Sequence, residues 1–223
     1  ARSYISSLEA WNRVSPSQGL PPALPPEIPP DGDEAGRSTR LRLKIAVSFE
    51  RHAQYDRSMR WLRTAATSMP PRRSDLRAAL YSSWSVALFR KGQFQEAIEW
   101  AKKALTAANR TGQPERIAYS HHVLANALGE TGRLRNSVWH REAALQLYEQ
   151  IGDLPRLMAG HGNLGISYQA LGEFPLAIEH HEECIKAADQ IGNSYAVAIG
   201  NLNLGEVILS QGHLEDAADL FES

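Results

Sequence analysis

The chain has few of the features that mark secreted, membrane-spanning or nucleic-acid-binding proteins. It contains one cysteine, Cys184, which cannot form an internal disulfide and fits a reducing cytoplasm. The N-terminal residues lack the apolar stretch of a secretory signal, and no apolar run approaches the length of about 18 residues that a membrane span needs. The formal net charge of -1 provides no basic surface for nucleic acid or anionic lipid. We therefore expect a cytoplasmic protein with no nucleic-acid or membrane partner.

Catalytic motifs are also missing: the chain has no P-loop, zinc-protease motif or nucleophile elbow. Gly160–Gly165 satisfies G-x-G-x-x-G, but a dinucleotide site needs a strand before that motif and a helix that opens at it. Here the glycines fall inside a predicted helix. We predict no catalytic residue, no cofactor and no enzyme activity.

Histidines are more numerous, and four of them recur at a spacing of forty residues: His121 with His161, and His140 with His180. Repetition of a structural unit produces such spacing without a ligand. No acidic residue or cysteine completes a tetrahedral set, so we predict packing histidines and no metal site. We expect residues 180–183 to form a solvated helix face and Cys184 to be a buried, inert thiol.

Seven glycines recur with regular spacing. Four are forty residues apart, and the other three each follow one of them by twenty residues: Gly92, Gly132, Gly172 and Gly212, then Gly112, Gly152 and Gly192. Twenty residues accommodate one helix of about four turns and a short loop. Self-similarity with a period of roughly 20–50 residues is typical of stacked-repeat proteins, which usually hold other molecules.

Small and large side chains keep their positions from one forty-residue segment to the next. We call a set of residues at one position of successive segments a column. One column is always small: Ser85, Ala125, Gly165 and Gly205. Another is always large and apolar (Trp84, Leu124, Leu164 and Leu204), and a third, also large and apolar, follows the turn glycine (Phe94, Leu134, Phe174 and Leu214). Within each half-segment these positions recur at helical spacing, and strand alternation is absent. Small residues on both helices of a pair allow the two axes to approach closely.

The third segment carries the most complete motif, L-G-x-x-Y followed by a turn glycine and two small residues: Leu164, Gly165, Tyr168, Gly172, Ala177 and Cys184. This pattern resembles the tetratricopeptide repeat family. The forty-residue length is similar to the long-helix form of spindle-orientation adaptors, kinesin light chains and bacterial regulator arrays. The resemblance implies an all-α, right-handed superhelical solenoid of antiparallel pairs, each with an A helix followed by a B helix.

The predicted organisation has three parts. Residues 1–14 form an amphipathic helix, residues 15–34 a proline-rich linker, and residues 35–223 the array. The array divides into units at about 35–73, 74–113, 114–153, 154–193 and 194–223, the last one truncated. Because the chain begins with Ala1 and stops within a period, we expect an excised piece of a longer protein.

Helix-start signals agree with these boundaries. Ser74, Asp153 and Asn193 are predicted to precede A helices, while Pro114 and Pro175 fall in first turns. In the first unit the A helix should run over about 36–52. Its inward residues are expected to be Ile45 and Phe49.

In the resembling family the A helices line a concave groove, which implies the partner-binding positions. The corresponding residues are Arg90, Tyr119, His122, Asn126, Glu130, Asn163, Gln169, Asn203 and Glu206. Asn163 and Asn203 occupy one column, and an amide offers both a donor and an acceptor to a peptide backbone. The alternative is that these amides simply face water. The A helices carry no Lys/Arg cluster of the kind that binds chaperone tails, so we do not expect that ligand.

We therefore predict a scaffold that binds a protein or peptide in the groove. One alternative is a ligand-sensing regulatory array of a bacterial signalling ATPase, cyclase or transcription regulator. Another is an array that forms homodimers through its open ends or its N-terminal helix.

Overall fold

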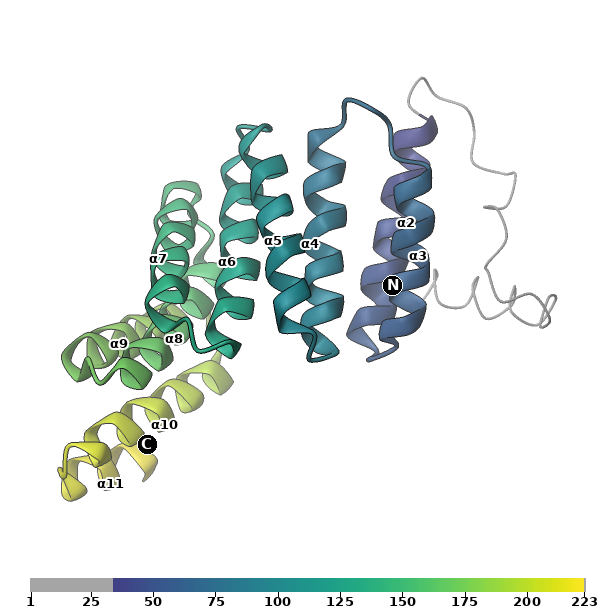
Figure 1. The fold of residues 1–223 in the computed structure, drawn as a ribbon. Coiled ribbons are helices and arrows are strands. Elements are labelled where there is room, and N and C mark those ends of the chain that lie inside the picture. Colours follow the sequence, from purple (N-terminus) through teal and green to yellow (C-terminus); the bar gives the residue numbers. More distant parts are fainter. Residues whose placement is uncertain (1–33, 223) are drawn as a thin grey trace. The chain divides into compact units, whose positions relative to one another are not determined.

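The computed structural model describes residues 34–222, and all regular structure within them is helical (Figure 1). The helices are α2 (Glu34–Arg51), α3 (Tyr55–Thr67), α4 (Ser74–Arg90), α5 (Phe94–Asn109), α6 (Pro114–Glu130), α7 (Leu134–Ile151), α8 (Leu154–Leu171), α9 (Phe174–Gln190), α10 (Ser194–Ser210) and α11 (Leu214–Glu222). None of these helices combines the length and hydropathy of a membrane span. The helix predicted at residues 1–14 and the linker after it lie outside the described residues.

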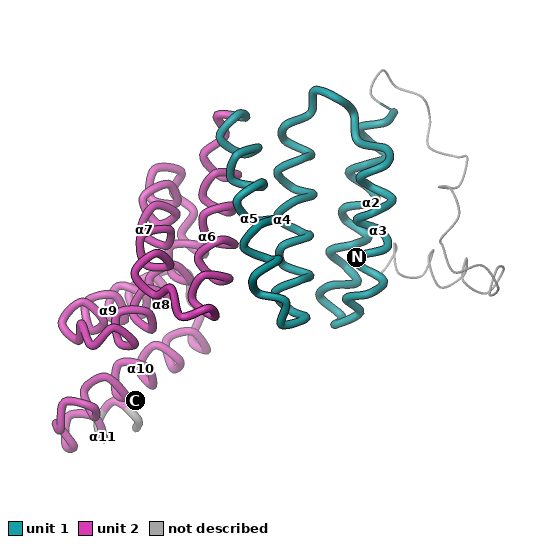
Figure 2. The backbone as a smooth tube through the Cα atoms, viewed as in Figure 1, with its two compact units in different colours: residues 1–111 teal, residues 112–223 magenta. Residues whose placement is uncertain are grey.

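Consecutive helices pack in pairs, α2 with α3 and so on to α10 with α11. In each pair we call the first member the A helix and the second the B helix. The prediction of an all-α array of paired helices is confirmed. The chain divides into two compact units, residues 1–111 with α2 to α5 and residues 112–223 with α6 to α11 (Figure 2).

The turn glycines close the helices as predicted. All seven have positive φ, between +64° and +91°. At the end of α4, for example, the Gly92 N–H donates to the Phe89 carbonyl at 2.9 Å, and the next N–H donates to the Leu88 carbonyl at 2.9 Å. This backbone conformation favours glycine because a Cβ atom would crowd the carbonyl oxygen.

Most predicted helix starts are confirmed. The Asp153 carboxylate accepts from the Arg156 N–H at 3.1 Å, and the Asn193 side chain accepts from the Ala196 N–H at 3.0 Å. Pro114 and Pro175 lie in first turns. The prediction for Ser74 was wrong: it is the first residue of α4 and does not cap it, because the preceding residue, Arg73, occupies the cap without a side-chain bond.

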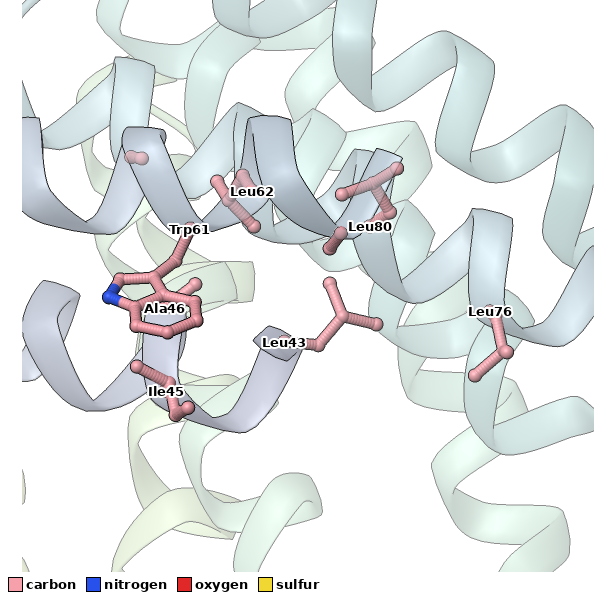
Figure 3. Packing of buried hydrophobic residues seen from close by; sticks show 9 residues of the cluster. Leu43, Ile45, Ala46, Trp61, Leu62, Leu76 and Leu80 are labelled. Atoms are coloured by element: carbon pink, nitrogen blue, oxygen red, sulfur yellow. The ribbon is translucent and has the colours of Figure 1, made fainter. Parts of the chain in front are cut away.

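Unit 1 is held together by an apolar cluster of α2, α3 and α4 (Figure 3). Leu62 and Ala46 are completely buried, and Trp61 is 7% exposed. Ile45 is buried as predicted, and Phe49 packs against the cluster while half-buried. In unit 2, Leu164 and Val207 occupy the corresponding interior without any exposure.

The small column brings A and B helices into close contact. In the α4–α5 pair the Ser85 hydroxyl donates to the Ala97 carbonyl at 2.7 Å. In the α6–α7 pair the Ser137 hydroxyl donates to the Ala125 carbonyl at 2.8 Å. These bonds join the two backbones through one short side chain. Such contact requires small residues on both helices.

Gly165 serves the same close approach in the α8–α9 pair. A Cβ atom there would lie 2.5 to 2.7 Å from the imidazole of His181, which is completely buried. The prediction that residues 180–183 form a solvated face was therefore wrong for His181, since the missing glycine side chain makes room for its ring. The packing role predicted for Gly165 is confirmed.

Ala53 has φ +56° at the turn between α2 and α3, where the later A–B turns have glycine. We predict that Ala53→Gly raises the free energy of unfolding by about 0.5–1 kcal/mol, because the relief of left-handed strain exceeds the added freedom of the unfolded chain. Ala198→Gly, at an exposed position inside α10, is the matched control and should lower stability by about 1 kcal/mol. Urea denaturation measures both, and destabilisation by Ala53→Gly would contradict the strain argument.

The contact between Gly165 and His181 makes a second prediction. Gly165→Ala should cost about 1–3 kcal/mol of stability, because the enclosed ring cannot move away from the new methyl group. The His181→Ala variant copies Ala101, the equivalent residue of the α4–α5 pair. In that background Gly165→Ala should stabilise the fold by roughly 1 kcal/mol, because alanine has the higher helix propensity. A double-mutant cycle from thermal denaturation tests this. Equal effects in both backgrounds would refute the contact.

Candidate partner-binding face

The A helices of unit 2 bury one side against their B helices and expose the opposite side. On α8, Leu164 and Gly165 are buried while Ile166, the next residue, is 52% exposed. On α10, Leu204 and Gly205 are buried and Glu206 is exposed. On α6, the residue that follows the buried Leu124 and Ala125 is half-buried. We define the A-face as the outward side of these helices, formed by Tyr119, His122, Asn126, Glu130, Ala159, Asn163, Ile166, Ile199, Leu202, Asn203 and Glu206.

The A helices of unit 2 carry most of the exposed apolar side chains. Among the described residues ten large hydrophobic side chains are exposed, and six of them lie on these helices: Tyr119 on α6, Ile166 on α8, and Tyr195, Ile199, Leu202 and Leu209 on α10. Four of the six belong to the A-face: Tyr119, Ile166, Ile199 and Leu202. Exposed apolar side chains that gather on one side of a protein are typical of interaction surfaces. The remaining four of the ten are distributed over α7, α9, α11 and a loop.

Three predicted site residues meet on α6. The rings of Tyr119 and His122 are stacked with centroids 6.4 Å apart, and the Asn126 amide nitrogen lies 3.1 Å from Nε2 of His122. Burial, together with the smaller effect of the positive charges of Arg141 and Arg156, lowers the pKa of His122 to about 4. His122 is consequently neutral at pH 7, its Nε2 accepts from Asn126, and its proton resides on Nδ1.

The remaining predicted residues are more dispersed. The Asn163 amide donates to the Ala159 carbonyl of its own helix at 2.8 Å, which leaves the side-chain oxygen and one amide hydrogen available to a partner. Gln169 and Asn203 are half-buried, while Glu130 and Glu206 are exposed. Arg90 lies in unit 1, where it forms an ion pair with Glu50 at 3.4 Å.

Two arginines near this cluster were not among the predicted site residues. Arg141 projects from α7, and Arg156 lies in the first turn of α8, where it pairs with Asp153. The prediction considered outward positions of A helices only, so a B-helix residue was not included. Both positive charges contribute to the lowered pKa of His122, which is one of the A-face residues.

Two pairs of histidines join A to B helices within unit 2. Nδ1 of His121 lies 2.8 Å from Nδ1 of His140, and the same atoms of His161 and His180 are 3.0 Å apart. At the equivalent positions of the α4–α5 pair, Tyr81 and Trp100 pack with ring centroids 5.4 Å apart. The interpretation of these histidines as packing residues is confirmed. No group of three metal-ligand side chains occurs in residues 34–222.

The G-x-G-x-x-G match and the single cysteine lie in the surroundings that the sequence predicted. Residues 160–165 lie inside α8, as expected for a G-x-G-x-x-G match that is not a dinucleotide site. Cys184 is buried, as expected, and burial raises the pKa of its thiol. A thiol of raised pKa is a poor nucleophile at neutral pH.

Residues 156–223 match the family model described as tetratricopeptide repeat. Residues 156–223 carry tetratricopeptide repeats. The match covers α8 to α11, and the equivalent columns extend to the earlier helix pairs. No curated protein sequence matches the chain.

Solved structures of tetratricopeptide type share the fold. The nearly identical TPR-like repeats of a Podosopora anserina protein described as a kinesin light chain superpose with a TM-score of 0.72, at 20% identity over 85% of this chain and 94% of theirs. BtubC from P. vanneervenii gives 0.78, at 18% identity over 99% of this chain and 86% of its own.

A third structure is a Signal Transduction ATPase with Numerous Domains with a tetratricopeptide repeat sensor, from Pyrococcus horikoshii. It gives a TM-score of 0.74 at 13% identity, over 97% of this chain and 32% of its own. At these identities the similarity concerns the fold alone.

The histidines of unit 2 predict a marked loss of stability in acid. Burial lowers the pKa of six of them: His121, His122, His140, His161, His180 and His181. A folded-state pKa below the unfolded value of about 6.5 means that the unfolded chain binds more protons, so stability falls as pH falls below that value. The loss extends to pH about 4 for His122 and His140.

Unfolding of unit 2 should therefore be easier by about 3 kcal/mol or more at pH 4.5 than at pH 7.5. Urea denaturation followed by circular dichroism at both pH values measures this. The variant His121→Tyr/His140→Trp copies Tyr81 and Trp100 of the α4–α5 pair, and it should lose less stability in acid than the natural chain. Equal losses in both proteins would show that this pair does not contribute.

Proposed function

We propose that this chain is a protein-interaction scaffold that binds a peptide, a helix or a partner domain on the A-face of unit 2. The observation that carries the proposal is that six of the ten exposed large hydrophobic side chains of the described residues lie on the A helices of unit 2, four of them on α10. Removal of these side chains from water is the main driving force for association with a partner. The tetratricopeptide repeats agree with this role, because the family generally provides protein-interaction modules.

The polar residues of the A-face would give the interaction its specificity. The Asn163 side-chain oxygen can accept from the backbone N–H of an extended peptide, and one amide hydrogen is left to donate to a backbone carbonyl. Asn203, in the same column, would make the equivalent contact. We propose that the A-face residues bind the partner and that the chain is not an enzyme, has no cofactor and works in the cytoplasm.

A second candidate is a sensor array within a larger signalling protein. It is favoured by the fold similarity to the Pyrococcus horikoshii protein, in which the similar region makes up about a third of the chain. The two functions share the same binding face and differ in what is attached to the array. The full reading frame distinguishes them, because an attached ATPase, cyclase or DNA-binding domain would identify a sensor.

The binding face can be tested with paired surface variants. Ile166→Glu/Leu202→Glu places two charges on the A-face at exposed positions, and we predict that it abolishes partner binding without changing the thermal denaturation midpoint. Trp139→Glu, on α7, is the matched control because this side chain is 59% exposed. It should bind as the natural chain does.

Chemical cross-linking in an extract of the source cells, followed by mass spectrometry, measures the partners of all three proteins. Sedimentation over a range of concentrations identifies the case in which the partner is a second copy of the chain. Equal binding by the natural chain and the A-face variant would contradict the proposal. Loss of binding only in Trp139→Glu would place the site on the B helices instead.

A further inference from the structure

The small net charge of the whole chain conceals a division of charge between its two units. Residues 34–111 contain 16 Lys and Arg against six Asp and Glu, whereas residues 112–222 contain six Lys and Arg against 15 Asp and Glu. The described part of unit 1 thus has an excess of ten positive charges, and that of unit 2 an excess of nine negative charges. An asymmetry of this kind within one chain indicates a charged partner.

The two excesses are visible at equivalent positions on the outward side of the B helices. The sixth and ninth residues of α3 are Arg60 and Arg63, and the sixth and ninth residues of α9 are Glu179 and Glu182. All four side chains are exposed. The same two positions of the repeat are therefore doubly basic on α3 and doubly acidic on α9.

The B helices between them do not carry two like charges at these positions. On α5 the two residues are Glu99 and Lys102, which form an ion pair at 3.1 Å. On α7 they are Trp139 and Glu142, and the Glu142 carboxylate accepts from the Tyr168 hydroxyl. The charges of α5 and α7 thus have partners within the chain.

The like charges on α3 and α9 lower the stability of their own helices. Side chains three residues apart are neighbours on a helix surface, so Arg60 repels Arg63, and Glu179 repels Glu182. Neither Arg63 nor Glu182 has a side-chain hydrogen bond or ion pair with another residue in the part of the chain that the structure describes. Opposite charges from another molecule would offset both repulsions.

One further charge on each helix defines the direction in which the two helices match. Asp56 lies one turn before Arg60 and its side chain is 78% exposed, while Lys186 lies one turn after Glu182 and its side chain is 63% exposed. We call Asp56, Arg60 and Arg63 the α3 face, and Glu179, Glu182 and Lys186 the α9 face.

The α3 face and the α9 face are complementary when the helices run antiparallel. The spacing of four and then three residues on α3 equals the spacing on α9 read backwards. An antiparallel arrangement therefore places Asp56 opposite Lys186, Arg60 opposite Glu182, and Arg63 opposite Glu179. A parallel arrangement would match the arginines with the glutamates but leave Asp56 and Lys186 without opposite charges.

We propose that the chain associates with a second copy of itself through this contact, with α3 of one copy antiparallel to α9 of the other. The inference goes beyond the proposed function, because it uses the B helices and leaves the A-face free. Arginine side chains suit the contact, since the planar guanidinium bonds a carboxylate through two parallel N–H groups. A single contact accounts for both charge excesses.

A polyanion accounts for less of the charge pattern. Nucleic acid or an anionic membrane would be attracted to unit 1 and repelled by the negative charge of unit 2. It would also leave the paired glutamates of α9 unexplained. The second copy supplies opposite charges to both helices.

The physical character of the contact determines how it should behave. Ion pairs between exposed side chains are individually weak, so association depends on the protein concentration and weakens with salt. The contact joins two different faces and is therefore heterologous. A dimer formed by one such contact retains a free α3 face and a free α9 face, so further copies can join.

Sedimentation velocity over a range of protein concentrations tests the association in the natural chain. At about 50 mM salt the average sedimentation coefficient should rise with concentration, and the dissociation constant should be at least about tenfold higher at roughly 500 mM salt. A natural chain that sediments as a monomer at every concentration in low salt would overturn the proposal.

Charge reversal on either helix should abolish association. Arg60→Glu/Arg63→Glu and Glu179→Arg/Glu182→Arg are each expected to be monomeric, because their α3 and α9 faces then carry like charges. Mixed in equal amounts, the two variants should associate with each other, since the new glutamates of the first oppose the new arginines of the second. A chain with all four changes should associate as the natural chain does.

Lys102→Glu/Lys103→Glu is the matched control on α5. It changes the net charge by the same amount as Arg60→Glu/Arg63→Glu, also at exposed positions, and it should leave association intact. Equal loss in this control would show a general effect of net charge and overturn the proposal. Circular dichroism verifies that every variant is folded, and failure of the folded, mixed variants to associate would also overturn it.

The same variants separate this inference from its alternatives. Double-stranded DNA and phosphatidylserine vesicles are offered to the natural chain and to Arg60→Glu/Arg63→Glu. Binding that this variant loses, by a natural chain that remains monomeric, would assign the α3 face to a polyanion and overturn self-association. The A-face variant Ile166→Glu/Leu202→Glu should self-associate normally, and loss of self-association there would place the contact on the A-face instead.

Discussion

Close contact between the two helices of each pair is the constraint on which the rest of the structure depends. It is made by small residues, and Gly165 against the buried His181 ring is its tightest example. Because one side of each A helix is committed to this contact, the opposite side must remain outside the pair. The same constraint therefore defines both the interior and the A-face.

This arrangement allows polar chemistry to vary without loss of the fold. The rings of Tyr81 and Trp100 pack together in the α4–α5 pair, and a pair of histidines replaces them in the α6–α7 and α8–α9 pairs. Likewise Ala101, Arg141 and His181 occupy one position on successive B helices. The substitutions give unit 2 titratable groups and an unpaired cation that unit 1 does not have at these positions. The two units thus share a repeat and differ in chemistry.

Several features could be predicted from the sequence because they depend on local backbone requirements. A left-handed turn favours glycine, so Gly92 and its equivalents indicated the helix ends, and side chains such as Asn193 indicated helix starts. The burial of Leu164 and Gly165 followed from helical periodicity. Each of these depends on a few neighbouring residues.

Other features depend on contacts that no short pattern reveals. His181 seemed solvated because it lies beside two glutamates, but the space left by Gly165 on the facing helix buries it. Arg141 was missed because its relation to the A-face arises only when α6, α7 and α8 pack together. The exposure of Tyr119, Glu130 and Glu206 is a property of this fold, whereas the identity of the partner is a property of another molecule.

Hydroxyl-radical footprinting of the chain with its cross-linked partner reports which side chains the partner covers. If the partner binds the A-face, oxidation of Tyr119, Ile166 and Leu202 should be reduced. Trp139 and Leu176, which are exposed on the B helices, should be oxidised as in the free chain. Protection of these two residues, with the A-face still accessible, would contradict binding on the A-face.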